Sequence, residues 1–415
     1  MEKSRIFNCA GISKLLAFVA VISLTMACSD DNNEIIDPEP QPQPIDVKNP
    51  ANYITDSAKL SMLRSMKDLD GEGRLYEIDY TADYKLDQAL AMGLSNTQEM
   101  LAFVANELFD IKPTSAANLN FNPGCSAFAV PDAESIDFFM GRNYDFRHTD
   151  STAIQGKFYV PTTAILVHTA PEGGKKSISL VDGVTLNKAY AQGFYGDGNA
   201  DISSLMGLPY APLDGINEDG FAIGVLALNE RATQQNVPGK KNITTTVAIR
   251  MLLDKASTVK QAIEMLKQYN MNMSGQGEFN NYHYFMADAT GDYAIVEYTI
   301  PTGDNIPRVM EVFTANDTAR CVTNFYVAPS MIGTTDGWGS NHGKARYETM
   351  RNVLRAKRYT LKENDAMDLL RAVSQPPTEE YTSQTQWSSL YNLTERSLRL
   401  CILRDYAKEY NFKVE

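Results

Sequence analysis

From residue 124 to its end, the chain is a series of short apolar segments with the length and alternation of β-strands. Two pairs of segments with helical spacing interrupt this series, at 245–255 with 259–269 and at 344–356 with 363–373. Strands and helix pairs in this order indicate sheets that are covered by helices, so we expect an α+β layered domain. The expected strands are 125–130, 136–141, 163–168, 221–228, 282–287, 293–298, 308–313, 387–392 and 397–403.

The first 27 residues have the pattern of a bacterial export signal. A basic start is followed by an apolar run at 15–27, which is too short to cross a membrane as a mature helix. The run ends in Leu-Thr-Met-Ala before Cys28, which resembles a lipoprotein signal, so we expect Cys28 to carry a lipid. The alternative is an ordinary signal peptide followed by an incidental cysteine. The expected location is the outer membrane of a Gram-negative bacterium, with a lipid anchor and with the protein facing the periplasm or the outside.

Residues 28–50 and 51–124 differ in character. The first stretch is rich in proline and acidic residues, which predicts an extended linker between the lipid and the folded protein. The second stretch has helical spacing at 58–66 and at 97–109, and a strand-like alternation at 74–84. We therefore predict a small, mostly helical segment ahead of a domain that spans residues 125–415.

Composition and missing motifs exclude several classes of function. The net charge is −13, from 38 basic and 51 acidic side chains, and an acidic chain without a basic stripe argues against nucleic acid as a partner. The four histidines and five cysteines are too scattered for a zinc cluster. The sequence contains no nucleotide-binding, metalloprotease or α/β-hydrolase nucleophile motif. We expect neither a cofactor nor a metal.

One stretch does carry a chemical pattern. Residues 123–128 read Pro-Gly-Cys-Ser-Ala-Phe and residues 141–146 read Gly-Arg-Asn-Tyr-Asp-Phe, so a cysteine opens the first strand of a predicted hairpin. Further motifs follow in order at 214–220, 228–231, 321–325, 344–347 and 386–392. Together they resemble the cysteine N-terminal-nucleophile hydrolases, namely the choloylglycine hydrolases and linear amide C–N hydrolases, with acid ceramidases and penicillin-type acyltransferases as relatives. The resemblance covers roughly residues 124–405 and implies a four-layer αββα sandwich.

The resemblance assigns roles to three residues of the hairpin. Cys125 is the nucleophile, Arg142 stabilises its thiolate, and Asp145 holds its α-amine. On an ideal strand Arg142 and Asp145 face opposite sides, so we expect the strand to end or bulge near Asn143. The structural alternatives are a buried core cysteine and an Arg142–Asp145 ion pair without a catalytic role.

Three further residues receive roles in the same way. The side-chain amide of Asn324 donates to the oxyanion, a backbone N–H near Asn229 is the second donor, and Arg346 orients the site from a helix. Asn is also common at turns and strand ends, and Arg346 can belong to a solvated helix face. Cys321 and Cys401 leave two possibilities open, a disulfide or two core cysteines.

A nucleophile of this family uses its own α-amine as the base, and such an amine has a reference pKa of roughly 7.7–8.0, so it can act as a base near neutral pH without a histidine. Cys125 must therefore become an N-terminus, and export cleavage before Cys28 falls too early to produce one. We predict autoproteolysis at the Gly124–Cys125 bond, because Gly124 has no side chain to hinder the attack. The pro-segment 51–124 would then remain as a non-covalent α-chain, as in acid ceramidases.

The expected function is that of an exported cysteine amidase. It would hydrolyse a linear, non-peptide amide of an apolar acyl group, such as a conjugated bile salt or an N-acyl lipid, through an acyl-thioester on Cys125. One alternative is an acyltransferase on the same scaffold, in which an amine replaces water as the acceptor. The other is a surface lipoprotein that only binds ligands.

Overall fold

The computed structural model describes most of the chain after residue 50. The described residues are 43–44, 51–112, 124–146, 148–149, 159–160, 163–189, 201–228, 233–272, 281–300, 307–314, 320–331, 341–376 and 384–415. Residues 42–415 belong to a single unit, so the segment at 51–112 is not separate from the rest.

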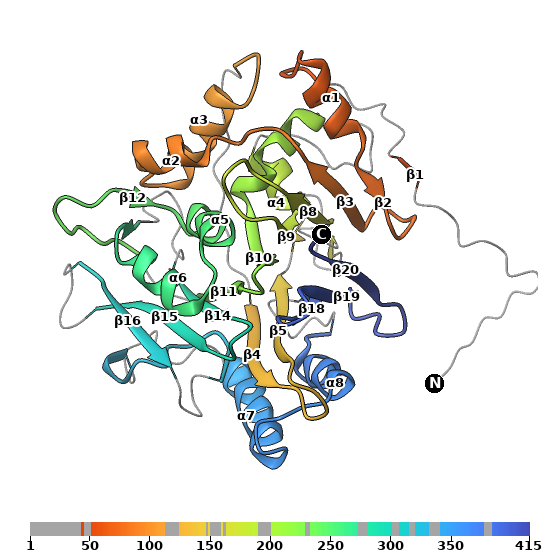
Figure 1. Cartoon of the computed structure of the whole chain (residues 1–415), viewed down its shortest axis with the longest axis vertical. Coiled ribbons are helices and arrows are strands. Elements are labelled where there is room, and N and C mark those ends of the chain that lie inside the picture. Colours follow the sequence, from red (N-terminus) through yellow and green to blue (C-terminus); the bar gives the residue numbers. More distant parts are fainter. Residues whose placement is uncertain are drawn as a thin grey trace, which may run out of the picture. The chain divides into compact units, whose positions relative to one another are not determined.

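Two large sheets run through the described part of the chain (Figure 1). The larger sheet has the order β1 (Gln43–Pro44), β2 (Lys67–Asp68), β3 (Leu75–Tyr80), β8 (Ala164–Thr169), β9 (Ser177–Asp182), β10 (Pro212–Asn217), β11 (Ala222–Leu228), β14 (Asn281–Ala287), β15 (Tyr293–Thr299) and β16 (Val309–Thr314). The smaller sheet has the order β17 (Cys321–Val322), β4 (Gly124–Pro131), β5 (Phe138–Phe146), β18 (Gln384–Asn392), β19 (Ser397–Ile402) and β20 (Tyr410–Lys413). Two minor pairs are β6 (His148–Thr149) with β7 (Tyr159–Val160), and β12 (Asn242–Ile243) with β13 (Asn270–Met271).

The central strands are buried on both faces, which explains their nearly continuous apolar sequences. Every residue of β10, β11, β14 and β15 is buried. One face of each sheet contributes to a shared apolar layer that includes Ala127, Met140, Leu226, Phe285 and Trp387. Because side chains alternate along a strand, the other faces are left for helices to cover.

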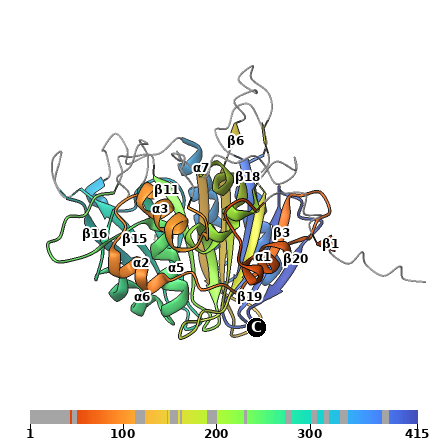
Figure 2. The same cartoon turned by 90° about the horizontal axis from the view of Figure 1, so that it is seen from above.

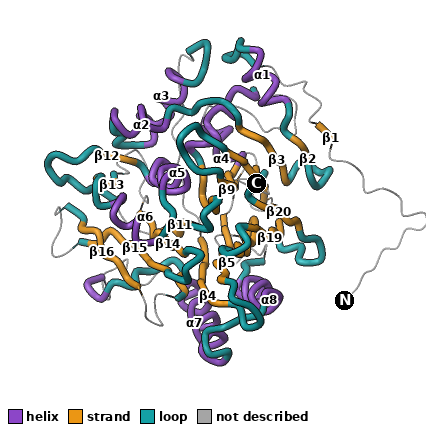
Figure 3. The backbone as a smooth tube through the Cα atoms, viewed as in Figure 1, coloured by secondary structure: helices purple, strands orange, loops and turns teal. Residues whose placement is uncertain are grey.

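Helices cover the outer face of each sheet. Helices α5 (Thr245–Lys255) and α6 (Val259–Leu266) pack in the core layer outside the larger sheet, whereas α7 (Asn341–Ala356) and α8 (Glu363–Val373) pack outside the smaller one. In Figure 3 strands cross the middle of the view, and α7 and α8 lie below them. The order of layers is helix, sheet, sheet, helix, which confirms the predicted αββα sandwich.

The segment at 51–112 is built into this sandwich. Its helices are α1 (Ser57–Arg64), α2 (Leu86–Met92) and α3 (Thr97–Glu107), and α1 lies against β3 (Figure 2). Strand β3 pairs in parallel with β8 along its whole length, from Leu75 opposite Ala164 to Tyr80 opposite Thr169. The segment is mostly helical, as expected, and it also supplies strands β2 and β3 to the larger sheet.

Two further helical elements follow β9, and the second of them contacts α1 and α3 of this segment. They are α4 (Gly183–Ala189) and the 3₁₀ helix η3 (Ile202–Tyr210), and all nine residues of η3 are buried. Among the described residues, no helix has the length and hydropathy needed to cross a membrane.

Candidate active site

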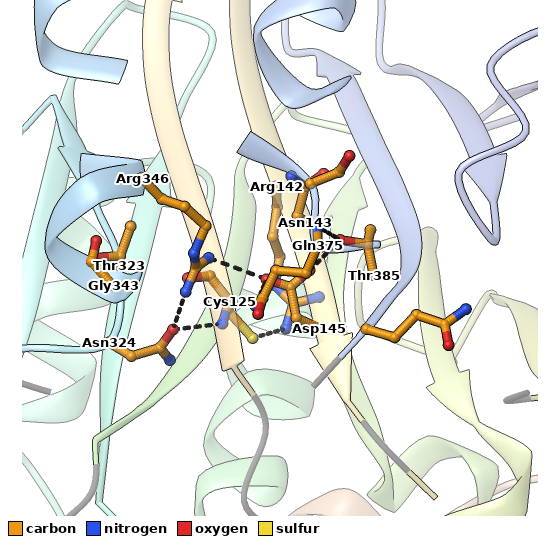
Figure 4. Close-up of polar contacts among 12 residues, drawn as sticks. Cys125, Arg142, Asn143, Asp145, Thr323, Asn324, Gly343, Arg346, Gln375 and Thr385 are labelled. Carbon is orange, nitrogen blue, oxygen red and sulfur yellow. Dashed lines mark hydrogen bonds and ion pairs between the residues drawn. The ribbon is translucent and has the colours of Figure 1, made fainter. Parts of the chain in front are cut away.

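Cys125 is the second residue of β4, and its side chain lies in the layer between the two sheets, fully buried (Figure 4). Its neighbour across the strand pair is Tyr144 of β5. The Arg142 Nη2 atom donates to Sγ at 3.6 Å, and the backbone N–H of Asp145 also faces the sulfur. Two N–H groups, one of them charged, are therefore placed to stabilise a thiolate.

Arg142 is itself held by a buried carboxylate. The guanidinium has no exposed surface, and it donates to the carbonyl oxygen of Val225 at 2.8 Å and to the carboxylate of Asp214. Asp214 also accepts hydrogen bonds from Trp387 Nε1 at 3.1 Å and from the hydroxyl of Tyr391 at 3.0 Å. Asp214 thus fixes the guanidinium and balances its charge.

Asp145 lies on the opposite face of β5, toward the helices. Its carboxylate accepts hydrogen bonds from Arg346 Nη1 at 3.0 Å, Gln375 Nε2 at 2.6 Å and Thr385 Oγ1 at 2.5 Å. All of these groups are buried, so the carboxylate has protein donors where water is excluded.

The predicted end or bulge near Asn143 is wrong. Strand β5 continues to Phe146, and its pairing with β4 is unbroken. The irregularity lies instead in β18, between Thr385 and Trp387. Both side chains can serve the site because they approach β4 from its two faces, Arg142 at the sulfur and Asp145 through Arg346.

Arg346 and Asn324 hold the backbone of Cys125. Arg346 Nη1 donates to the carbonyl oxygen of Cys125 at 2.8 Å, and Nη2 donates to Asn324 Oδ1 at 2.9 Å. The same Oδ1 accepts the Cys125 N–H at 2.7 Å, while Asn324 Nδ2 donates to the carbonyl oxygen of Ala227 at 2.7 Å. Two donors meet at Oδ1, which fixes the orientation of the amide.

Burial raises the pKa of the Cys125 thiol to about 11, although Arg142 and Arg346 act in the opposite direction. Each of these arginines already faces a carboxylate, Asp214 and Asp145 respectively, so their positive field at the sulfur is partly cancelled. With the Gly124–Cys125 bond intact, the thiol is therefore neutral at physiological pH.

The structure brings together five of the predicted residues. Asn229 and the lipidation candidate Cys28 lie outside the described residues. Cys321 and Cys401 are both buried and neither forms a disulfide, so the core alternative holds for both. Asp214, which holds Arg142, and Gln375 and Thr385, which hold Asp145, were not predicted from the sequence. Asp214 does lie in one of the sequence motifs, at 214–220. No three His, Cys, Asp or Glu side chains gather into a possible metal site within the described ranges.

Comparison with known families identifies the family of the chain. Residues 190–405 match the family model described as "Acyl-coenzyme A:6-aminopenicillanic acid acyl-transferase". The chain belongs to this family. The matched region includes Asn324 and Arg346 and begins after Cys125, Arg142 and Asp145, whose place in the site comes from the geometry above.

The individual proteins and solved structures that resemble this chain share limited sequence with it. A penicillin V acylase of Pectobacterium atrosepticum is 34% identical over 92 residues, which are 20% of this chain and 24% of that protein, so the match spans about a quarter of the relative. A variant of the conjugated bile acid hydrolase from Clostridium perfringens has a TM-score of 0.46 at 15% identity, covering 70% of this chain and 92% of its own. The penicillin V acylase from Agrobacterium tumefaciens has a TM-score of 0.41 at 17% identity, covering 67% of this chain and 83% of its own.

Proposed function

We propose that this protein is a cysteine amidase that cleaves a linear, non-peptide amide through an acyl-thioester on Cys125. One observation carries the proposal: three polar atoms of Cys125 are each held by a different side chain. Arg142 contacts Sγ, Asn324 accepts the N–H, and Arg346 donates to the carbonyl oxygen. Such preorganised contacts, set around a single buried thiol, favour nucleophilic catalysis over a purely structural role.

The proposal requires the Gly124–Cys125 bond to be cut. In the intact chain the nitrogen of Cys125 is an amide, which cannot accept a proton. Attack of Sγ on the carbonyl carbon of Gly124 forms a C–S bond and breaks the C–N bond, while the thiol proton passes to the leaving nitrogen. Water then hydrolyses the thioester, which leaves a carboxylate at Gly124 and a free α-amine on Cys125.

The mature site can then act on a substrate amide. The α-amine takes the proton of Sγ, and the sulfur attacks the carbonyl carbon of the substrate. One N–H of Asn324 Nδ2 donates to the carbonyl oxygen of Ala227, and the other would donate to the oxyanion, a contact typically worth about 3 kcal/mol in the barrier. The α-ammonium returns the proton to the leaving amine, and water releases the acid from the thioester.

The pro-segment would remain attached after cleavage. Strand β3 is paired with β8 inside the larger sheet, and the Tyr84 hydroxyl donates to Asp254 Oδ2 of α5 at 2.6 Å. Asp254 also forms a buried ion pair with Arg250 at 2.6 Å. If Cys28 is lipidated in an exported protein, the anchor would hold the catalytic chain at the membrane only through these contacts.

The proposed substrates are N-acyl amides with an apolar acyl group and a small polar amine, such as conjugated bile salts or N-acyl lipids. Acyl transfer to an amine is the second candidate function, because the matching family model is described as an acyltransferase. Both functions share the acyl-thioester and differ only in what attacks it.

A substrate panel tests the proposal. Purified wild type and Cys125→Ala would be incubated with conjugated bile salts, N-acyl amino acids, N-acylethanolamines, ceramides and phenoxyacetyl penicillins, and the released amine would be measured. We expect release by the wild type and none by the variant. Adding a second amine and analysing the products separates hydrolysis from transfer. No release from any substrate, or equal release by the variant, contradicts the proposal.

A further inference from the structure

A buried Glu–His pair lies outside the predicted catalytic residues. Glu297 of β15 and His283 of β14 have no exposed side-chain surface, and Nδ1 of the imidazole lies 2.8 Å from Oε1 of the carboxylate. Strand alternation places them on the same face as Phe285 and Ile295, which belong to the layer between the sheets. A carboxylate in an apolar layer is costly unless its oxygens are hydrogen-bonded.

The carboxylate of Glu297 binds the backbone of another segment. Oε1 accepts the N–H of Val327 at 2.8 Å, and Oε2 accepts the N–H of Ala328 at 3.0 Å. One side chain therefore holds two successive peptide groups. His283 lies beside the same oxygen, and its ring is 6.2 Å from that of Tyr326.

The segment held in this way, 323–328, carries Asn324. At its start, Thr323 Oγ1 donates to the carbonyl oxygen of Gly343 in α7 at 2.8 Å. Near its end, the Tyr326 hydroxyl accepts from Arg308 Nη1 at 3.1 Å. Asn324 thus lies in a short segment that is hydrogen-bonded to α7 at its start and to Glu297 of the larger sheet at its end.

We propose that Glu297 is a positioning residue for Asn324. It acts through the backbone of Val327 and Ala328 and sets where the Asn324 amide meets Cys125 and the oxyanion. The inference rests on the proposed function, in which Asn324 is catalytic. A displacement of about 1 Å in a catalytic group can lower the rate roughly a hundredfold. The contact of Glu297 with Val327, three residues from Asn324, can therefore affect the rate.

Glu297→Gln is the test substitution. Glutamine keeps the size of the side chain but has one acceptor oxygen, so its NH₂ group would face one of the two backbone N–H groups. Glu77→Gln is the matched control, because Glu77 of β3 also lies beside an imidazole, with its Oε1 2.9 Å from His168 Nε2. The control therefore replaces a partly buried carboxylate beside an imidazole on β3, which five strands separate from β15 in the larger sheet.

Kinetics and hydrogen–deuterium exchange provide the two readouts. We expect Glu297→Gln to lower kcat roughly 10- to 100-fold, with KM changed less than about twofold, because chemistry and not binding is disturbed. In an Asn324→Ala background the same substitution should change kcat by less than about twofold, since the group that it positions is gone. Amide exchange in residues 323–328 should become faster. Glu77→Gln should change none of these quantities.

Several results would overturn the proposal. The first is an unchanged rate of amide exchange at 323–328 in Glu297→Gln. The second is a loss of kcat from Glu297→Gln that is as large in the Asn324→Ala background as in the wild type. The third is an equal loss of kcat in Glu77→Gln. If Glu297→Gln does not fold, Glu297→Asp keeps the charge but shortens the reach, and it should show the same pattern to a smaller extent. If the wild type cleaves no amide, that result contradicts the proposed function instead. Amide exchange at 323–328 then tests by itself whether Glu297 holds this segment in place.

Discussion

At the scale of single residues, the site depends on arginines that are paired with buried carboxylates. Arg142 faces Asp214 and Arg346 faces Asp145, and all four side chains are at least nine-tenths buried. Such pairs gain little net stability, because removing two charges from water costs about as much as their attraction returns. Their value here is positional, since each guanidinium also contacts an atom of Cys125.

Replacing Asp214 should disable the site through Arg142. Asp214→Asn leaves a buried guanidinium without its counter-charge, which should lower the free energy of unfolding by about 3 kcal/mol and slow turnover at least about tenfold. Chemical denaturation and amine release measure the two effects. Asp137→Asn is the control, because Asp137 lies in the turn before β5, where its carboxylate accepts a hydrogen bond from Asn392 Nδ2 of β18 at 2.9 Å. Full activity in Asp214→Asn would show that Arg142 needs no partner.

The reactivity of Cys125 should depend on cleavage of the preceding bond. In an uncleaved protein the pKa of about 11 keeps the thiol protonated, so labelling by iodoacetamide at pH 7 is slow and increases roughly tenfold per pH unit up to that pKa. After cleavage a neighbouring α-ammonium favours the thiolate, so the increase should level off at a lower pH. Gly124→Val, whose branched side chain shields the carbonyl, supplies the uncleaved form. Identical pH profiles for the two proteins would contradict this account.

The residues of the site itself could be predicted from the sequence, but the residues that hydrogen-bond to Arg142 and Asp145 and hold them in place could not. Cys125, Arg142, Asp145, Asn324 and Arg346 stand in motifs whose order along the chain is itself a signal. Partners such as Gln375 and Thr385 are uncharged, follow no spacing rule, and meet Asp145 only because α8 and β18 converge on it. Asp214 was visible in the sequence, but its role depends on a contact between the two sheets.

At the scale of elements, β10 and β11 show how an apparent turn motif becomes part of the site. Residues 214–217 are strand, and the chain turns only at 218–220, where Gly220 has a φ of +79° and where a Cβ would lie 2.0 Å from the carbonyl oxygen of Leu393. Strands β9 and β10 were not expected from the sequence. In β10, Asp214 and Gly215 interrupt the apolar run that marks a buried strand, because the strand contributes a carboxylate to the site.

Strand β11 should tolerate no side chain at Gly224. A Cβ there would lie 2.6 Å from Cδ of Arg142, and that arginine is already tied to Asp214 and Val225. Gly224→Ala should therefore lower activity at least about tenfold and stability by about 1–3 kcal/mol.

The control for steric cost alone is Gly141→Ala, whose Cβ would meet the ring of Phe128 at 2.5 Å on the helix side of β5. It should lose similar stability and less activity. Equal activity losses in the two variants would show that overpacking, and not displacement of Arg142, is the cause.

At the scale of the whole molecule, the segment at 51–112 behaves as part of the core. It contributes Leu63, Tyr80, Leu90, Phe103 and Val104 to the same apolar cluster as α5 and η3. Sequence periodicity identified α1, α3 and β3 but could not show where they pack. Parallel pairing of β3 with β8 joins strands that are far apart in the sequence, and no local pattern encodes it.

The two chains should therefore remain together after cleavage. Gel filtration of the matured protein should give one peak that contains both fragments, and high salt should not separate them, because apolar burial and backbone hydrogen bonds are little screened. Denaturant should separate them, since residues 29–124 contain no cysteine and a lipidated Cys28 has no thiol left for a disulfide. Release of an active 125–415 fragment by salt or mild detergent would contradict this arrangement.

Self-cleavage at Cys125 is tested by the intact mass of the purified protein beside that of Cys125→Ala. We predict that the wild type separates into two chains, the larger of which begins at Cys125, and that the variant stays whole. A wild type that remains one chain yet cleaves amides would contradict the central claim, because Cys125 would then act without a free α-amine.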